Sequence, residues 1–499
     1  MSRRLFVVVF AAGFVGCTGE TPAVEYTEDI RIDAAADGND PDSFGTRMCM
    51  TGDGTVYVLW MDNRENPDED VYDIWMNRSV NLGAKDSWLP AAVKVNQGDG
   101  NVWKPDLYCN ELGVFVVWED DRDGELDNHQ VYFNRSTDKG ESFLPEDKLL
   151  EEDPDGNSMS LEPKITGFGQ DLFVVWYDSL NGAYDVLVSS SSDAGESWHP
   201  PTRVDSDDPA GSAYSARPKI AVGENGLDVW VVWEDSRDGK ADIYFARSET
   251  GGNQFDEDQR LDEGDDDGAN DSFEPQLCSD GGDNVYAVWH DARNGDGRDI
   301  YMNYSGDKGI DWGGAATRLE VDSPGFGNSL FPVCAAEGST LHVAWHDKLN
   351  EGEGYDIYYR TVEAGIPGND PVRLDVGTPA GYANSLDPRI ALNDGTVLVA
   401  WQDGRGEVEA GSDNGYDDLY YNYSEGGAPF SASEDFRIDS MYDGKSFKVD
   451  TNVTLLGGSW YAAWTDGRGG TSDIYFQTFA IGDQAKPPPL EALEQAQGQ

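Results

Sequence analysis

The sequence predicts an all-β protein built from eight repeats, and three observations lead to this fold class. The tripeptide Trp-x-Asp recurs at spacings of 58, 58, 57, 56, 56, 56 and 63 residues. Each of these tryptophans ends an apolar run rich in β-forming residues, such as Val229 to Trp233. Helical periodicity is missing along the chain, which argues against a helical solenoid. The repeated tryptophans are Trp60, Trp118, Trp176, Trp233, Trp289, Trp345, Trp401 and Trp464.

Each repeat contains four short predicted strands. The first is opened by a proline, the second ends at the tryptophan, the third reads like Asp242-Ile243-Tyr244, and the fourth like Arg203-Val204-Asp205. Four short strands in a unit of about 56 residues are typical of a β-propeller blade. We therefore predict one domain, residues 28–482, as an eight-bladed β-propeller with four-stranded blades. The marking prolines are Pro105, Pro163, Pro218, Pro275, Pro332 and Pro388.

The two ends of this domain complement each other. The first predicted strand, Arg31-Ile32-Asp33, is of the fourth type, whereas the last, Asp473 to Phe479, is of the third type. We predict that residues 28–33 complete the eighth blade and close the ring, because this pairing removes an exposed sheet edge. Residues 483–499, with three consecutive prolines, are predicted to form a disordered tail.

The N-terminus has the features of a targeting segment. Arg3 and Arg4 precede an apolar run from Leu5 to Val15, which predicts a signal peptide over residues 1–16. The following Cys17 ends a segment, Phe14-Val15-Gly16-Cys17, that resembles a bacterial lipobox. We expect lipidation of Cys17, a linker over residues 17–27, and an exported lipoprotein of the outer membrane or cell surface. A periplasmic or secreted protein with an ordinary signal is the alternative.

The charge of the chain excludes two classes of partner. There are 95 Asp+Glu against 35 Lys+Arg, which gives a formal net charge of -60. Such a surface repels nucleic-acid phosphates and anionic lipid headgroups, so we expect no nucleic acid and no membrane contact except through a lipid anchor. The acidic surface suits either cation binding or solubility in salty water. We expect a monomer that binds a glycan or a protein.

Three hairpins carry a second motif: Ser136 to Phe143, Ser191 to Trp198 and Ser305 to Trp312. The pattern resembles the Asp-box, or BNR repeat, of the sialidase-like β-propellers. Asp and Ser side chains bond the turn backbone there, and Gly supplies a positive φ. The resemblance implies the fold and a non-catalytic bacterial lipoprotein member of that family. It says little about activity.

The resemblance implies a catalytic set that this sequence does not supply. Sialidases hold the substrate carboxylate with three arginines, the first in a Phe-Arg-Ile-Pro segment, and use a paired Tyr and Glu with an Asp. The nearest segments here are Ala216-Arg217-Pro218 and Pro388-Arg389-Ile390, both at the proline of the repeat. Sialidases of this kind have six blades. We therefore carry over no catalytic residue.

The loop after the second strand repeats an arginine two residues beyond the Trp-x-Asp aspartate in six blades. In a propeller this loop and the loop before the first strand share one face, where ligands usually meet the channel mouth. The arginines form either a ligand clamp or Asp–Arg pairs that hold each loop; their recurrence in register favours the pairs. They are Arg64, Arg122, Arg237, Arg293, Arg405 and Arg468.

Two loops before first strands follow the ligand spacing of a calcium loop, with acids at positions 1, 3, 5 and 12 and Gly at position 6. Clustered carboxylates suit Ca²⁺, which takes six to eight oxygens. An acidic chain also produces such strings by composition alone. We predict structural Ca²⁺ in these loops. The candidate ligands are Glu151, Asp153, Asp155 and Glu162 in one loop, and Glu263, Asp265, Asp267 and Glu274 in the other.

Four cysteines lie 9 to 11 residues before a blade tryptophan, in neighbouring blades. Cys49 with Cys109, and Cys278 with Cys334, are candidate disulfides in an oxidising compartment. Buried free thiols are the alternative, and the Cα separation decides between them.

From these features we predict a surface-tethered propeller, more consistent with binding than with catalysis, whose ligand is a glycan or a protein. The alternative is an exo-acting glycosidase, sialidase-like, or a lyase, with its site at the channel mouth. Convergent carboxylates with an aromatic platform would indicate a glycosidase. A symmetric ring of Asp–Arg pairs would indicate binding.

Overall fold

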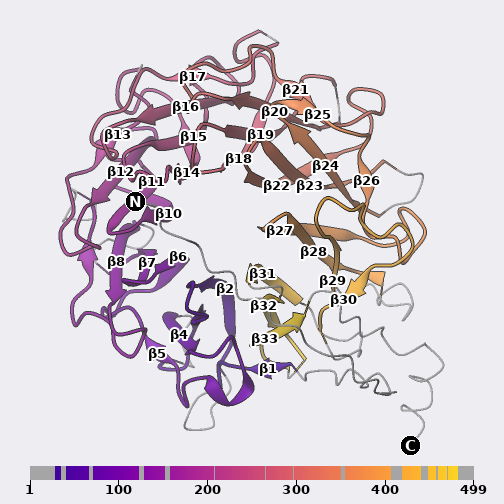
Figure 1. Ribbon diagram of the computed structural model, residues 1–499. Helices are drawn as coiled ribbons and strands as arrows, with labels where there is room; N and C mark the ends of the chain where they lie inside the picture. The colour runs from indigo at the N-terminus through magenta and orange to yellow at the C-terminus, as the bar shows by residue number, and fades with distance from the viewer. Residues whose placement is uncertain are drawn as a thin grey trace, which may run out of the picture.

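The computed structural model describes residues 29–34, 41–66, 71–122, 128–151, 158–206, 208–264, 266–295, 297–349, 354–405, 418–439, 448–456, 459–468 and 470–480. These residues form eight antiparallel sheets, arranged as the blades of a ring (Figure 1). The eight-bladed β-propeller predicted from the sequence is therefore confirmed.

The two inner strands of each blade carry the core. The innermost strands are β2 (Ser43–Met50), β6 (Val102–Asn110), β10 (Ser160–Phe168), β14 (Ser215–Val222), β18 (Ser272–Ser279), β22 (Ser329–Glu337), β27 (Ser385–Asn393) and β31 (Lys448–Leu456). The second strands are β3 (Val56–Asp62), β7 (Gly113–Asp120), β11 (Asp171–Asp178), β15 (Val229–Asp235), β19 (Val285–Asp291), β23 (Thr340–Asp347), β28 (Thr396–Asp403) and β32 (Ser459–Asp466).

The two outer strands finish each sheet. The third strands are β4 (Asp73–Ser79), β8 (Gln130–Ser136), β12 (Asp185–Ser191), β16 (Asp242–Ser248), β20 (Asp299–Ser305), β24 (Asp356–Glu363), β29 (Asp418–Ser424) and β33 (Asp473–Ala480). The outermost strands are β1 (Ile30–Arg31), β5 (Val93–Lys94), β9 (Lys148–Leu149), β13 (Thr202–Arg203), β17 (Gln259–Arg260), β21 (Thr317–Arg318), β26 (Val372–Arg373) and β30 (Phe436–Arg437). A short strand, β25 (Ile366–Pro367), also pairs with β24, and a 3-10 turn, η1 (Lys85–Ser87), follows β4.

The ring is closed by the N-terminal strand. β1 pairs with β33, with Ile30 opposite Phe476, so the last blade runs β1-β33-β32-β31. The next residue, Ile32, donates its backbone N–H to Ile474 at 3.0 Å and is 3% exposed. The predicted closure is confirmed, and Figure 1 shows both ends of the propeller in one blade.

The hydrophobic core lies between blades rather than within one. A cluster that includes Val117 and Phe133 of the second blade also contains Val174 and Trp176 of the third. Second strands are buried on both faces because each blade packs against two neighbours, and every repeated tryptophan is 0% exposed. This double burial explains why these strands read as continuous apolar runs.

The innermost strands begin before their prolines, which differs from the sequence prediction. Pro163, for example, is the fourth residue of β10 and lies within a register shift between Leu161 and Lys164. The same shift occurs in all eight innermost strands. Proline lacks an N–H, so it is tolerated where a bulge interrupts the ladder.

The hairpins that carry the Asp-box-like motif form compact turns at the end of the blades opposite the bulges. Asp138 Oδ1 accepts hydrogen bonds from Ser136 Oγ at 2.7 Å and from the N–H of Ser142 at 3.0 Å. Gly140, with φ 76°, donates its N–H to Ser136 Oγ at 2.8 Å. Asp193 is held in the same way by Ser191 and Ser197. The motif thus holds its own turn.

Candidate functional site at the channel mouth

The bulges place one residue per blade at the top of the innermost strands. Each of these residues has a positive φ, between 48° and 71°. The strands start opposite the Trp-x-Asp aspartates, as Ser160 does with Asp178, so the bulges lie at the end of the ring where the loop arginines are. We call this set the rim: Gly45, Lys104, Glu162, Arg217, Glu274, Phe331, Asp387 and Asp450.

The backbone of the rim is repeated, but its side chains are not. Seven of the eight residues are not glycine, although a left-handed conformation is strained for other residues. Because the conformation recurs in all eight blades, it reflects the fold. The side chains differ in size and in sign of charge from blade to blade, and this difference is where a ligand site can arise on a symmetric scaffold.

The middle residue of the Trp-x-Asp motif in one blade accepts a hydrogen bond from the backbone of the rim residue in the next blade. Glu119 Oε1 accepts the backbone N–H of Glu162 at 2.7 Å, and Glu234 Oε1 accepts that of Glu274 at 2.8 Å. Both acceptors are buried. A bulge leaves a donor without its ladder partner, and these carboxylates satisfy it.

Arg217 is the centre of the most elaborate rim cluster. Its Nη1 donates to Glu234 Oε2 at 2.9 Å, and its Nε lies 3.6 Å from Glu274 Oε1. The side chain of Arg217 is 39% exposed, against 3% for Glu234. Burial raises the pKa of Glu234 despite Arg217. Burial alone would lower the pKa of Arg217, but the charges of Glu234 and Glu274 raise it. The guanidinium therefore stays charged and is partly exposed to solvent.

Three tyrosines stand beside this cluster in an edge-to-face chain. The ring centroids of Tyr177 and Tyr184 are 5.0 Å apart, and those of Tyr184 and Tyr214 are 5.2 Å apart. Tyr214 is 44% exposed. Burial raises the pKa of all three phenols, so they are neutral donors at pH 7. They supply apolar faces with hydroxyl groups at their edges.

Two further groups continue the mouth on either side. In the second blade, His129 Nδ1 lies 2.8 Å from Glu119 Oε2, and its ring stacks on Trp103 at 4.3 Å. In the sixth, Phe331 is 44% exposed and contacts the rings of His290 and His346. Burial lowers the pKa of His290 to about 3 and that of His346 to about 4, so both are neutral. The mouth therefore combines aromatic faces with a few charged groups.

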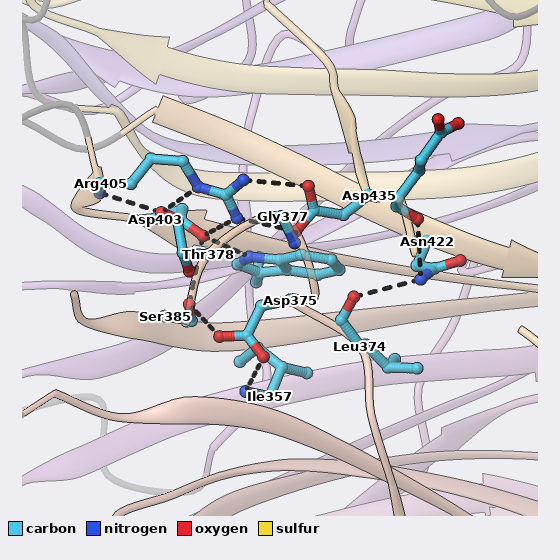
Figure 2. A network of polar contacts seen from close by, with 12 residues as sticks. Ile357, Leu374, Asp375, Gly377, Thr378, Ser385, Asp403, Arg405, Asn422 and Asp435 are labelled. Atoms are coloured by element: carbon cyan, nitrogen blue, oxygen red, sulfur yellow. Dashed lines mark hydrogen bonds and ion pairs between the residues drawn. The ribbon is translucent and has the colours of Figure 1, made fainter. Parts of the chain in front are cut away.

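The six loop arginines do not belong to the rim, and each pairs with an aspartate close to it in the chain. Arg405 is typical: its Nε donates to Asp403 Oδ1 at 2.8 Å and its Nη1 to Asp435 Oδ1 at 2.9 Å (Figure 2). Its guanidinium also lies 3.8 Å over the Tyr420 ring. Each of the six pairs with the aspartate two residues before it, and their side chains are 7% to 16% exposed. Each of these arginines therefore holds its own loop in place through a buried ion pair, and we call these Asp–Arg pairs the staples.

The aspartates of the staples also take part in the contacts between neighbouring blades. In Figure 2, Ser385 Oγ donates to Asp375 Oδ2 at 2.8 Å and is 3.2 Å from Asp403 Oδ2. Asp375 follows the outermost strand β26 of one blade, and Asp403 ends the second strand β28 of the next. Asp375 Oδ1 also accepts the N–H of Ile357 at 3.2 Å. One serine thus joins two neighbouring blades through two buried carboxylates.

The candidate calcium ligands are separated by their structural roles. Both oxygens of Glu151 are used, one by the N–H of Val131 and one by Ser160 Oγ at 2.9 Å. Glu162 and Glu274 belong to the rim, and Asp267 pairs with Arg260. Glu263 is exposed. Asp153, Asp155 and Asp265 lie outside the described residues. Within the described residues no group of three or more acids, histidines or cysteines gathers as a metal site. Because three of the eight candidate ligands lie outside those residues, the calcium site stays a prediction.

The four candidate cysteines are joined in pairs. Cys49 is bonded to Cys109 with Cα atoms 6.0 Å apart, and Cys278 to Cys334 with Cα atoms 6.1 Å apart. These bonds tie β2 to β6 and β18 to β22, which are innermost strands of adjacent blades. Cys17 lies outside the described residues. Among the helices of the described part, none has the length and apolar character needed to cross a membrane.

Sequence reasoning missed the rim cluster. It noted Arg217 and Arg389 only as poor matches to a sialidase segment. The available signal was variation within the repeat: the residue before each proline and the residue inside each Trp-x-Asp change between blades, while their neighbours recur. The bulge that brings these two variable positions together is not visible in the sequence.

No protein-family model matches the chain, and no curated protein matches it. Among solved structures, the polysaccharide lyase Uly1 is 12% identical over 78% of this chain and 92% of its own, with a TM-score of 0.46. An α-L-arabinofuranosidase from Fusarium graminearum is 16% identical over 70% and 98%, with a TM-score of 0.39. The Hadza microbial sialidase Hz136 is 15% identical over 74% and 76%, with a TM-score of 0.35. Proteins of similar structure thus include a lyase, a glycosidase and a sialidase, and the proposals below rest on this chain's own side chains.

Proposed function

We propose that this protein is an exported β-propeller that binds a glycan at the channel mouth. The observation that carries the proposal is the cluster of Arg217 with its two carboxylates beside the exposed Tyr214. Aromatic faces pack against the C–H faces of sugars, and a few fixed charged groups orient their hydroxyls. The loop arginines, by contrast, are already paired and offer little surface.

A glycosidase is the second candidate, and Glu234 is the observation that favours it. Burial raises the pKa of this carboxyl, as in a general acid. Against it, both oxygens of Glu234 are engaged, one by the N–H of Glu274 and one by Arg217. A carboxyl that holds the backbone and an arginine in place is poorly free to transfer a proton. We therefore favour binding over hydrolysis.

A glycan array with parallel turnover assays on the same glycans tests this function. We expect binding without cleavage. Tyr214→Ala and Arg217→Gln should each weaken binding about tenfold or more. Tyr382→Ala is the matched control, because Tyr382 is 42% exposed but lies three blades away. Cleavage that is lost in Glu234→Gln would replace the binding proposal with the glycosidase. Equal losses in Tyr214→Ala and Tyr382→Ala would remove the mouth as the site.

Export and tethering are part of the proposal. The two disulfides support export, because such bonds persist in oxidising compartments. Tethering rests on the lipobox-like segment, and Cys17→Ser should move the protein from the membrane to the soluble fraction. Ca²⁺ binding stays a prediction from loop spacing. Chelation should lower the melting temperature, and Asp153→Ala with Asp265→Ala should remove that effect; a melting temperature indifferent to chelator would end it.

A further inference from the structure

A second ring of residues lies just below the rim on the same innermost strands. Each of these residues comes two positions after the bulge, so this ring is roughly 6–7 Å further along the channel. Although the chain carries 95 acidic and only 35 basic residues, four of the eight residues of this ring are basic and one is acidic. We call its four cations, Arg47, Lys164, Lys219 and Arg389, the cationic belt. The other members are Asp106, Gln276, Val333 and Asn452.

The belt cations act on one another across the channel. Burial is the largest cause that lowers the pKa of Lys164 in the third blade and of Arg389 in the seventh. The charges of Asp106 and Asp387 oppose this effect, and the charge of Arg47 in the first blade adds to it at both sites. Lys219 acts on Lys164 as well. The interactions of Arg47 with these two cations skip the second and eighth blades, so they run through the central opening. Figure 1 shows β2, β10, β14 and β27 all bordering that opening.

Among the described residues, the belt cations make few direct contacts with carboxylates. Lys164 Nζ bonds the carbonyl of Pro163 at 3.2 Å, and Arg389 Nη1 bonds that of Pro388 at 3.0 Å. Within the described residues, the direct carboxylate contact is that of Arg47 Nε with Asp106 Oδ1 at 3.8 Å. Asp106 also accepts the N–H of Ile165 at 2.9 Å through its other oxygen. Each loop arginine, in contrast, has a carboxylate at hydrogen-bond distance.

Besides Asp106, which lies in the same ring, the acids that act on the belt lie above it, on the rim. Glu162 acts on Lys164, and Asp387 and Asp450 act on Arg389. This arrangement puts negative groups at the entrance and positive groups inside. Below the belt, a cavity of about 480 Å³ opens, lined by Thr166, Ile220, Leu277, Ala335, Glu337 and Leu392. The innermost strands therefore leave room beyond the belt.

We propose that the cationic belt binds the anionic group, a carboxylate or a sulfate, of the glycan that enters the channel mouth. The inference rests on the proposed function and names its ligand class, an acidic saccharide. Four converging cations in a protein-walled space repel one another, and an anion offsets that repulsion more strongly there than in water. Arginine and lysine donors form short, charge-assisted hydrogen bonds with such oxyanions. The acidic rim would orient the ligand, with its charged end inward and its neutral rings against the tyrosines.

Calorimetric titration of the purified full chain at fixed ionic strength tests this inference. The probes are a glucuronic acid oligosaccharide, a sulfated oligosaccharide, a neutral oligosaccharide and inorganic sulfate. We expect at least one acidic saccharide to bind, with affinity falling as salt rises. Lys164→Gln with Lys219→Gln should weaken that binding about tenfold or more, since two charge-assisted contacts are lost. Comparing the two acidic saccharides shows whether the group is carboxylate or sulfate.

Two controls separate the belt from a general charge effect and from misfolding. Lys240→Gln removes one positive charge from an exposed loop, where Lys240 Nζ lies 3.5 Å from Asp271, and should bind like the parent. Lys219→Arg keeps the charge and should keep the binding. Equal loss in Lys240→Gln and in the belt variant would overturn the inference, as would tight binding of acidic saccharides that the belt variant retains.

The two proposals fail in different ways. If only neutral saccharides bind, and Tyr214→Ala abolishes that binding, the glycan proposal stands and the belt inference is overturned. If inorganic sulfate binds through the belt but no saccharide does, the anion site stands and the glycan proposal is overturned. An absence of binding to all four probes contradicts the belt inference.

Discussion

The propeller contains two sets of cations that differ in exposure and in how fully they are paired with acids. One set is the loop arginines, and the other is the cations of the rim and the belt. Arg405 is 9% exposed, stacked on an aromatic ring and held by two aspartates. Arg217 on the rim is 39% exposed, and Arg389 in the belt bonds carbonyls of its own strand. The first set repeats from blade to blade, whereas the second changes. Repetition with full pairing indicates stabilisation, and variation with incomplete pairing indicates ligand binding.

The largest effect should come from removing the closing strand, because it supplies partners to two staples. Asp29 pairs with Arg468 at 2.7 Å, and the carbonyl of Asp33 accepts from Arg64 Nη2 at 3.0 Å. Deleting residues 28–33 also removes the buried Ile32 and leaves β33 as an open edge. We expect a loss of more than about 5 kcal/mol in the free energy of unfolding.

Chemical denaturation of the truncated protein measures this loss. Deletion of residues 494–499 from the predicted tail serves as the control. If the two truncations unfold alike, strand closure is not what holds the ring.

The second effect separates a staple from the rim. Arg405→Gln leaves Asp403 and Asp435 buried without their cation, and should cost about 3–5 kcal/mol of stability. Arg217→Gln lies at a more exposed site and should cost about 1 kcal/mol or less. Thermal or denaturant unfolding of both variants checks the ranking. A rim substitution that destabilises as much as the staple substitution would contradict the division drawn here.

The third effect concerns three buried aspartates, Asp205, Asp347 and Asp375. Burial raises the pKa of Asp205 and of Asp375 to about 7, and that of Asp347 to about 6. The folded state therefore binds these protons more tightly than the unfolded chain, where Asp titrates near 3.9. The resulting stability is complete below about pH 4 and is lost as pH rises through about 6–7.

We accordingly expect the melting temperature to rise by about 2–5 °C between pH 8 and pH 5. Asp375→Asn should reduce this slope. Asp193→Asn should not, because hydrogen bonds with Ser197 lower the pKa of Asp193 to about 2, outside that range. A slope of the opposite sign in differential scanning calorimetry would refute the assignment.

The smallest expected effect is a gain in stability when the missing loop arginine of the sixth blade is restored. In the sixth blade Leu349 stands where the loop arginine is expected, and among the described residues Asp347 Oδ1 is buried without a hydrogen-bond partner. Leu349→Arg should supply the missing donor and stack on Tyr358, with a gain of about 1 kcal/mol at pH 7. Lys348→Arg is the control, since it places a guanidinium one position away without changing the net charge. An equal gain in both variants would show that the position beside Asp347 does not matter and would contradict this prediction.

The repeat could be predicted from the sequence because its signals are local. Trp60 and its counterparts each end an apolar run, which marks a buried second strand. Gly140 marks a turn, because glycine readily adopts a positive φ. Pairing of Arg31-Ile32-Asp33 with the last blade followed from counting strand types. Pairing of Cys49 with Cys109 was one of two open alternatives, because sequence position alone does not give a Cα separation.

Only the tertiary structure decided which charges face each other. Glu151 looks like a calcium ligand in sequence, yet it caps Val131 and Ser160, because the fourth-strand acid of each blade meets the next blade there. Arg217 and Lys164 look like scattered basic residues, yet the bulge and the ring bring them to the mouth and the channel. Local pattern fixes which residues form strands, whereas the closing of eight blades around one axis fixes which strands share a space. The sequence by itself therefore determined the propeller, and its closure decided where a ligand can bind.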